Sequence, residues 1–474
     1  MVDMKRILEG VPDYQAFMTV DELDASTRRL AEEYPDVVKV FEAGVSRQGH
    51  PILGLRIGNG GLNALCFACP HPNEPIGAMS IEYFSRLLAE DQELREELGY
   101  TWYMIKCIDP DGTRLNEGWF KGPFNLYNYM RHYFRPVGTE QVEWTFPVKH
   151  KALEFDSPLP ETEVLMRLIE ETKPKFMYSL HNTGFGGAYW YLSEPMPSIY
   201  EALYGATRRQ QVPISMGEPE SPSVIEYAPA IYHHLSAGQA YDYLEQYGGN
   251  PAAFDCGTSS ADYVLTRTGD CVTLLTELPY FFDPRIENVK DSEVTRVEAI
   301  RQHVEQSQRE QQNLEDILKN VRRLLQRHNP FAKLVEQILL QGGQDGAAKL
   351  KWAENLPDAY RPATVSQLFT NLEVASFYYG LALGLVIRAC EFELEHLSRD
   401  PLESCADEAA LRALTTARQK GLEKLCELSE QLEQAMEYTV IPIQKLVRIQ
   451  IECGLIVSAE VRHKHEGWST QEDK

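Results

Sequence analysis

The chain has 474 residues, and its 46 basic and 70 acidic side chains leave a formal net charge of −24. A protein this acidic repels nucleic-acid phosphates and anionic lipid heads, so we expect neither a nucleic-acid nor a membrane partner. An apolar content of 43% is sufficient for an ordinary packed core.

The N-terminal residues show no apolar segment typical of a secretory signal, and no apolar stretch approaches the roughly 20 residues that span a bilayer. The nine cysteines are scattered along the chain, which suits reduced, buried thiols. We therefore expect a cytoplasmic, globular protein.

Up to about residue 284 the sequence alternates short apolar runs with amphipathic segments, which is the pattern of an α/β fold. Four runs are predicted to be buried strands, at residues 62–68, 101–108, 176–180 and 271–276. Residues 76–88 and 161–171 are predicted to be helices between them. We therefore predict a mixed, largely parallel sheet flanked by helices, over a domain of residues 1–284.

Beyond this point long helical patterns replace the β pattern, at residues 294–326, 365–397 and 407–438. Breaks are expected at Asn329-Pro330, Leu356-Pro357, Asp400-Pro401 and Gln341-Gly342-Gly343. We predict a separate all-α domain over residues 285–474. Its apolar stripes favour a bundle within the chain, and a seam between the chains of a homo-oligomer is the alternative.

Three predicted strands end in polar residues. His71 and Glu74 follow the first, His181 follows the third, and Glu277 ends the fourth. In open α/β sheets ligands bind at the carboxyl ends of the strands, and two imidazoles with one carboxylate form a typical catalytic zinc site. The same H-x-x-E spacing recurs at His463, but in a charged C-terminal segment with no strand before it. We therefore predict that the zinc site includes His71 and not His463.

The order of these motifs resembles the zinc carboxypeptidase family over roughly residues 14–284. The resemblance includes the H-x-x-E motif, a strand leading to Pro110-Asp111-Gly112, the helix start Pro160-Glu161-Thr162, and Ser259-Ser260-Ala261-Asp262-Tyr263, which is similar to the family's "G-S-x-D-W". It implies one zinc ion per chain, held by His71, Glu74 and His181. It also implies that Glu277 is the general base, which accepts a proton from water and returns it to the leaving amine.

The residues that hold a substrate carboxylate in the family are altered in this chain. In Arg114-Leu115-Asn116-Glu117 the expected Asn116 is present, but Glu117 stands where the family has arginine. A carboxylate there would repel the substrate's own carboxylate. Asn73, inside the zinc motif, resembles the H-G-N-E version of aspartoacylase-like relatives.

Two further substrate-binding positions follow from the same comparison. The family's active-site tyrosine aligns with Phe254, which has no hydroxyl group, and Ala261 occupies a position that tunes side-chain preference. The segment of residues 125–135 is dense in Tyr, Asn and Arg, and Arg131 or Arg135 could supply the missing cation. The alternative for this segment is a surface loop whose rings pack on the domain.

The sequence therefore predicts a zinc-dependent hydrolase that cleaves an amide bond of a peptide or peptide-like substrate. Asn73 and the altered carboxylate site keep an aspartoacylase-like deacylase as an alternative. A non-catalytic binding protein of the same fold is the third reading, and the intact set of His71, Glu74, His181 and Glu277 argues against it.

Overall fold

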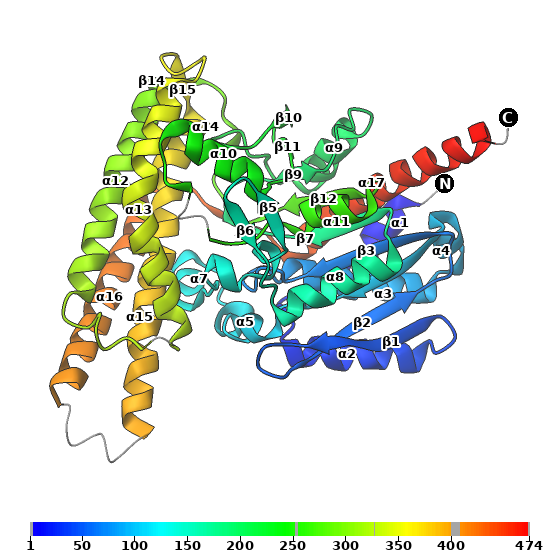
Figure 1. The fold of residues 1–474 in the computed structure, drawn as a ribbon, viewed down its shortest axis with the longest axis horizontal. Coiled ribbons are helices and arrows are strands. Elements are labelled where there is room, and N and C mark those ends of the chain that lie inside the picture. Colours follow the sequence, from blue (N-terminus) through cyan, green and yellow to red (C-terminus); the bar gives the residue numbers. More distant parts are fainter. Residues whose placement is uncertain (1–2, 252–254, 327, 400–407, 473–474) are drawn as a thin grey trace.

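The computed structural model describes residues 3–251, 255–326, 328–399 and 408–472. A nine-stranded mixed sheet forms the centre of the α/β part (Figure 1). Its strands lie in the order β1 (Val38–Val45), β2 (Pro51–Ile57), β4 (Tyr100–Ile105), β3 (Leu62–Ala68), β7 (Phe176–Leu180), β12 (Val272–Glu277), β9 (Tyr189–Leu192), β11 (Ile231–His233) and β10 (Glu226–Ala228). The four predicted strands are confirmed as β3, β4, β7 and β12, which are consecutive neighbours with parallel β4–β3, β3–β7 and β7–β12 pairs.

Helices cover both faces of this sheet, because its central strands are apolar on both sides. One apolar cluster joins the sheet to α3 (Ile76–Glu90) and α17 (Ile443–Glu472), and α1 (Met4–Glu9), α2 (Val20–Glu33) and α9 (Tyr200–Gln210) pack against these two helices. On the other face a second cluster joins the sheet to α8 (Pro160–Thr172) and α11 (Ser260–Thr268). The predicted arrangement of a largely parallel sheet flanked by helices is therefore confirmed.

Shorter elements connect these layers and reach the strand ends. They are α4 (Gln92–Leu98), α5 (Pro110–Arg114), α6 (Glu117–Phe120), α7 (Leu126–His132), α10 (Ala237–Tyr247), β5 (Val148–His150), β6 (Leu153–Phe155), β8 (Thr183–Phe185), β13 (Pro279–Phe282) and the 3-10 turn η2 (Val142–Trp144).

The second half of the chain forms a helical bundle at the left of Figure 1, beside the α/β part. It consists of α12 (Arg296–Leu318), α13 (Pro330–Glu354), α14 (Val365–Phe369), the π-helical turn η5 (Thr370–Val374), α15 (Ala375–Arg399) and α16 (Glu408–Ala435). Short strands β14 (Asp291–Thr295), β15 (Pro362–Thr364) and β16 (Thr439–Val440) accompany it. Leu414, Leu425 and Leu432 of α16 are buried within the chain, in line with the favoured bundle.

The expected break at Gln341-Gly342-Gly343 is wrong, because α13 runs through it from Pro330 to Glu354. Each glycine costs a helix about 1 kcal/mol relative to alanine. Helix α13 packs against both α12 and α15, and this tertiary packing outweighs that cost. The break at Asn329-Pro330 is confirmed, since Asn329 caps α13 and Pro330 is its first residue.

The helical run Val365–Leu397 is long and apolar enough to cross a membrane, but 67% of its most apolar window is buried inside the protein. It packs on α7, where Gly384 allows a close approach: a Cβ atom there would lie 1.9 Å from the carbonyl oxygen of Met130. Arg388 adds hydrogen bonds to the carbonyl oxygens of His132 and Tyr133, at 2.7 and 3.0 Å. This run therefore behaves as a core helix that joins the bundle to the α/β part.

The last helix, α17, leaves the bundle and lies along the sheet (Figure 1, red). It contacts α3, α9, β7 and β12, and its side chains share one apolar cluster with the sheet and with α15. The boundary between residues 284 and 285 stays a prediction, and the structure adds that residues 443–472 pack on the part of the chain that precedes it.

Candidate metal centre and active site

Three parallel neighbouring strands bring the predicted ligands to one edge of the sheet. Ala68 of β3 pairs with Leu180 of β7, and Leu180 pairs with Thr276 of β12. His181 and Glu277 directly follow Leu180 and Thr276, and the loop after β3 carries His71 and Glu74. The common register therefore places residues from three distant parts of the chain side by side.

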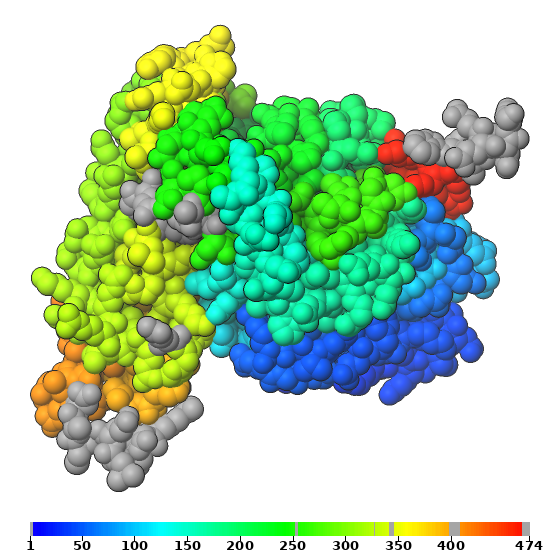
Figure 2. Space-filling model, viewed as in Figure 1, coloured from blue at the N-terminus to red at the C-terminus, as the bar shows by residue number. Residues whose placement is uncertain are grey.

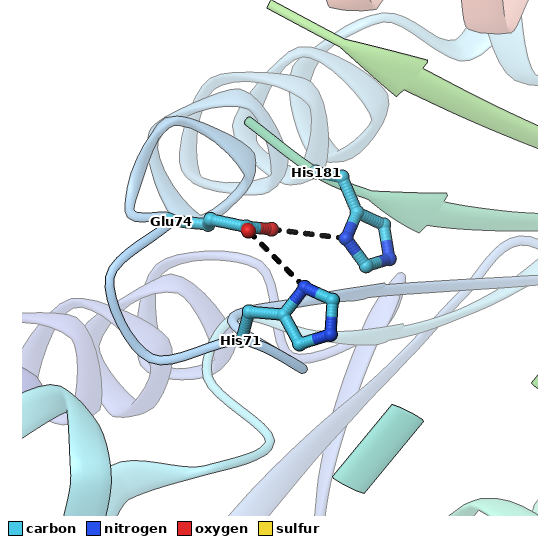
Figure 3. A group of neighbouring side chains, drawn as sticks. All are labelled: His71, Glu74 and His181. Carbon is cyan, nitrogen blue, oxygen red and sulfur yellow. Dashed lines mark hydrogen bonds and ion pairs between the residues drawn. The ribbon is translucent and has the colours of Figure 1, made fainter. Parts of the chain in front are cut away.

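The carboxylate of Glu74 lies between two imidazole rings (Figure 3). Its Oε1 atom is 3.1 Å from Nδ1 of His71, and its Oε2 atom is 2.9 Å from Nδ1 of His181. All three side chains are buried, and one donor atom from each lies within 4.8 Å of the others. Donors in a tetrahedral zinc site are about 3.4 Å apart, given zinc–ligand distances near 2.1 Å. The three residues therefore fit zinc.

The approach of α3 to the sheet depends on Gly77. A Cβ atom at this position would lie 2.6 Å from Cβ of Leu180 and 2.9 Å from Cβ of Ala68. Only glycine lets the first turn of α3 come this close to β3 and β7. Because Glu74 lies three residues before Gly77, this contact also sets the position of its carboxylate beside His181.

Negative charge exceeds positive charge around His181. Burial opposes protonation of its imidazole, but the carboxylates of Glu74, Glu143 and Glu277 outweigh burial and raise the pKa of His181 to about 10. At His71 burial dominates and lowers the pKa to about 4. The surroundings of His181 therefore stabilise positive charge. This agrees with a set of side chains that could bind a metal cation.

A second carboxylate lies behind His181 and has no counterpart among the sequence predictions. Oε2 of Glu143 is 3.8 Å from Nε2 of His181, and Oγ of Ser179 is 2.7 Å from the same nitrogen. Ser260 donates to Oε1 of Glu143 from its backbone N–H and its hydroxyl, at 2.9 and 2.8 Å. These groups hold Nε2 as the protonated nitrogen and leave Nδ1 to face Glu74.

Glu277 lies beside this cluster. Its Oε1 atom is 3.8 Å from Nδ1 of His181, and its Oε2 atom is buried without a hydrogen-bond partner among the described residues. Burial, followed by the charge of Glu74, raises its pKa well above the ordinary value. A buried carboxylate oxygen without a hydrogen-bond partner is costly, so the free Oε2 atom is consistent with a chemical role for Glu277.

Of the two arginines predicted to supply a cation, the structure brings only Arg135 to the site. Nη1 of Arg135 is 3.5 Å from Oε1 of Glu74, and the side chain lines the adjacent cavity. Arg131 forms an ion pair of 2.7 Å with Glu391 of α15 and does not line this cavity.

Asn116 does not reach the cavity either, because its amide group is occupied elsewhere. Nδ2 donates to the carbonyl oxygens of Gly112 and Phe134, and Oδ1 accepts from the N–H of Phe134. Asn116 therefore anchors the backbone next to Arg135 and cannot hold a substrate itself. Glu117 accepts from the N–H of Val20 at the start of α2 and does not line the cavity, so the expected repulsion of a substrate in this cavity is not supported.

The remaining predicted positions differ in their placement. Asn73 lines the cavity, and its Oδ1 atom is buried without a partner among the described residues. Ala261 is buried in α11, outside the cavity lining. Phe254 lies outside the described residues. Tyr129, Tyr133 and Tyr378 bring phenol groups to the cavity instead.

The sequence predictions missed Ser179 and Tyr378. A local pattern could have indicated the first residue but not the second. Ser179 lies two residues before His181, and the alternation of a strand places both on the same face. Tyr378 comes from α15 and hydrogen-bonds to Thr183 across 195 residues of sequence, at 3.0 Å. No local pattern indicates such a contact.

A cavity of about 670 Å³ lies next to these groups. On the α/β side its lining includes Asn73, Glu74, Arg135, Glu220 and Glu277, and helices of the bundle line the opposite side. Figure 2 shows the bundle set against the α/β part. The candidate active site therefore lies between the two halves of the chain.

Comparisons with known proteins agree with this geometry. A family model described as zinc carboxypeptidase matches residues 23–269. Zinc carboxypeptidase A 1 of Drosophila melanogaster is 31% identical over 111 residues, which is 21% of this chain and 26% of that protein. The aligned part thus spans about a quarter of that relative's length.

Solved structures are more distant. Carboxypeptidase A of Helicoverpa armigera has a TM-score of 0.35 and 16% identity, covering 58% of this chain and 70% of its own. A metallo-carboxypeptidase of Burkholderia cenocepacia has a TM-score of 0.33 and 14% identity, covering 55% and 60%. The family match alone includes more than half of the sequence, with both predicted zinc-binding motifs. The chain belongs to the zinc carboxypeptidase family.

Proposed function

We propose that the protein is a zinc-dependent hydrolase that cleaves an amide bond of a peptide or peptide-like substrate, with Glu277 as the general base. The observation that carries this proposal is the position of Glu277. Its partnerless Oε2 atom lies in the cavity wall, beside the cluster of His71, Glu74 and His181.

Nδ1 of His71, the carboxylate of Glu74 and Nδ1 of His181 would hold one zinc ion per chain. When bound, zinc would polarise a carbonyl group and lower the pKa of a water molecule to about 7. The carboxylate of Glu277 accepts a proton from the attacking water and passes it to the nitrogen of the leaving amine. The guanidinium group of Arg135 attracts an anionic group of the substrate.

The buried environment of Glu277 favours this role over a purely binding function. A binding protein gains nothing from a buried carboxylate oxygen such as Oε2 that has no hydrogen-bond partner, because it costs folding free energy. A general base gains from it, because the partnerless Oε2 atom is left to accept a proton from water.

The test is incubation of the zinc-loaded full-length protein with a mixed peptide library, followed by mass spectrometry. We expect stepwise loss of single C-terminal residues, which stops when zinc is removed with a chelator and returns when zinc is added. The matched control is Glu277→Gln, which should leave the peptides intact. Cleavage that continues at the same rate in this variant, or no cleavage by the native protein, would contradict the proposal.

A further inference from the structure

The bundle forms a roof over the candidate active site. We define the roof as the cavity-lining residues of α12, α13, η5 and α15. Tyr378 ties it to the site, because its hydroxyl is 3.0 Å from Oγ1 of Thr183, two residues after His181. The close approach of Gly384 to α7 holds the same helix in place. A substrate in the cavity therefore contacts both halves of the chain.

The size of the cavity limits the substrate. Pockets of roughly 300–1,000 Å³ bury most of the surface of a drug-sized ligand, and a peptide of about two to four residues is of that size. The cavity of about 670 Å³ lies within this range. A longer polypeptide would extend beyond the cavity, so only a short peptide would have its free amino group inside it.

The face of α12 that looks into the cavity is polar except for Leu314. His303, Ser307, Glu310 and Gln311 all line it, and their spacing of four, seven and eight residues places them on one side of the helix. A helix face that only packs against a protein core is normally apolar. His303 bonds through Nδ1 to the carbonyl oxygen of Asn371 at 3.0 Å, and Gln311 donates from Nε2 to that of Leu339 at 2.7 Å, so both hold the roof together. The carboxylate of Glu310 is the charged group that this face presents to the cavity.

Glu310 is the charged member of this face on α12. Its carboxylate accepts a hydrogen bond from Nε2 of Gln306 at 2.9 Å and forms no ion pair with any residue in the described part of the chain. Burial raises the pKa of Glu310 to about 7. A cationic group in the cavity would stabilise the ionised carboxylate and so offset the free-energy cost of burying its charge. Arg135, on the α/β side of the cavity, offers the opposite charge.

We propose that the cavity binds short peptides of about two to four residues, whose free amino group contacts the carboxylate of Glu310 on the roof. This inference rests on the proposed function, since it assumes that the amide bond to be cleaved lies near Glu277 and the peptide's carboxylate lies toward Arg135. The amino end then points away from Glu277, to the roof. The substrate class is therefore small and zwitterionic: the cavity volume suits a short peptide, and Glu310 favours its amino group.

Calorimetry on the zinc-loaded, full-length Glu277→Gln variant tests this site without turnover. The probes are one tripeptide, the same tripeptide with an acetylated amino group, and a decapeptide that ends in the same three residues. We expect the free tripeptide to bind at least tenfold more tightly than either of the other two. Equal affinities for the free and acetylated tripeptides, equal affinities for the tripeptide and the decapeptide, or no binding of the tripeptide would overturn the inference.

Adding Glu310→Gln to the Glu277→Gln variant should abolish its preference for the free tripeptide over the acetylated one. Glu305→Gln is the matched control, because Glu305 is exposed on the same helix, outside the cavity lining, and the change removes the same charge. A preference that survives Glu310→Gln would overturn the assignment of the amino-group site. If the free tripeptide binds as expected but the native protein does not cleave it, the proposed function fails while the binding site stands.

Discussion

Gln450, on the last helix of the chain, donates a hydrogen bond from Nε2 to the carbonyl oxygen of His181 at 2.9 Å. Its Oε1 atom accepts from the hydroxyl of Ser80 on α3 at 2.7 Å, and its own carbonyl oxygen accepts from Tyr178 at 3.1 Å. The side chain is fully buried. Helix α17 thus supports the backbone of a proposed zinc ligand that lies 269 residues earlier in the sequence.

Gln450→Ala should therefore weaken both folding and zinc binding. The change leaves the buried carbonyl of His181 without this partner, at a cost of about 1–3 kcal/mol. The hydroxyl of Ser80 keeps its hydrogen bond to the carbonyl oxygen of Ile76 at 3.0 Å. Urea unfolding and zinc titration measure the two effects. Gln419→Ala, at an exposed position on α16, is the control and should change neither. Unaltered stability of Gln450→Ala would show that the hydrogen bonds contribute nothing.

The zinc ligands can be tested by metal analysis. The purified protein should contain about one zinc ion per chain, and His71→Ala or His181→Ala should abolish binding, because each removes one of three protein ligands. His463→Ala is the control, since His463 has the same H-x-x-E spacing but is exposed on α17. Full zinc content in the His71 or His181 variant would refute the assignment.

Glu277→Gln should keep its zinc and its thermal stability but lose turnover. An amide cannot accept the proton of the attacking water, so we expect a loss of more than tenfold, or about 1.4 kcal/mol in barrier height. Steady-state kinetics with a peptide that the native protein cleaves measure this loss of turnover. A smaller loss would mean that Glu277 is not the base.

The two candidate arginines give opposite expectations. Arg135→Gln should raise KM for peptides with a free carboxylate by about tenfold or more, because hydrogen bonds to charged groups contribute about 1.5–3 kcal/mol. Arg131→Gln breaks the ion pair with Glu391 and should change stability slightly while leaving KM unchanged. Comparison of both variants on peptides with free and amidated C-termini separates the two roles. A raised KM in the Arg131 variant would reverse the assignment.

Stability should depend on pH through Asp109, which caps α5 and is fully buried. Burial raises its pKa to about 7, above the value of about 3.9 expected in the unfolded chain. The folded state therefore holds this proton more tightly, and the resulting stability is complete below about pH 4 and lost as the pH rises through 7.

Urea unfolding at pH 5 and pH 8 tests this dependence. Asp109→Asn cannot ionise, so its stability should fall less between the two pH values than that of the native protein, by at least about 1.4 kcal/mol, one pKa unit. The same pH dependence in both proteins would mean that Asp109 is ionised throughout.

Local patterns were enough to predict much of the α/β part and the candidate metal centre. The strands at 62–68 and 176–180 were predicted with the observed bounds, because a buried parallel strand is a short continuous apolar run. His71, Glu74, His181 and Glu277 follow such runs. Since parallel neighbours end at one edge of a sheet, their proximity could be inferred once the strands were identified.

The rest depended on contacts between residues far apart in the chain. The roles of Asn116 and Arg131 could not be read locally, because hydrogen bonds to Phe134 and an ion pair with Glu391 occupy their side chains. The glycines at 342 and 343 suggested a break, but packing on α12 and α15 kept α13 continuous. The support of His181 by Gln450 and the roof formed by Tyr378 and Glu310 arise where α17 and the bundle fold back onto the sheet. Such contacts join residues that only the tertiary fold brings together, so a local sequence pattern cannot predict them.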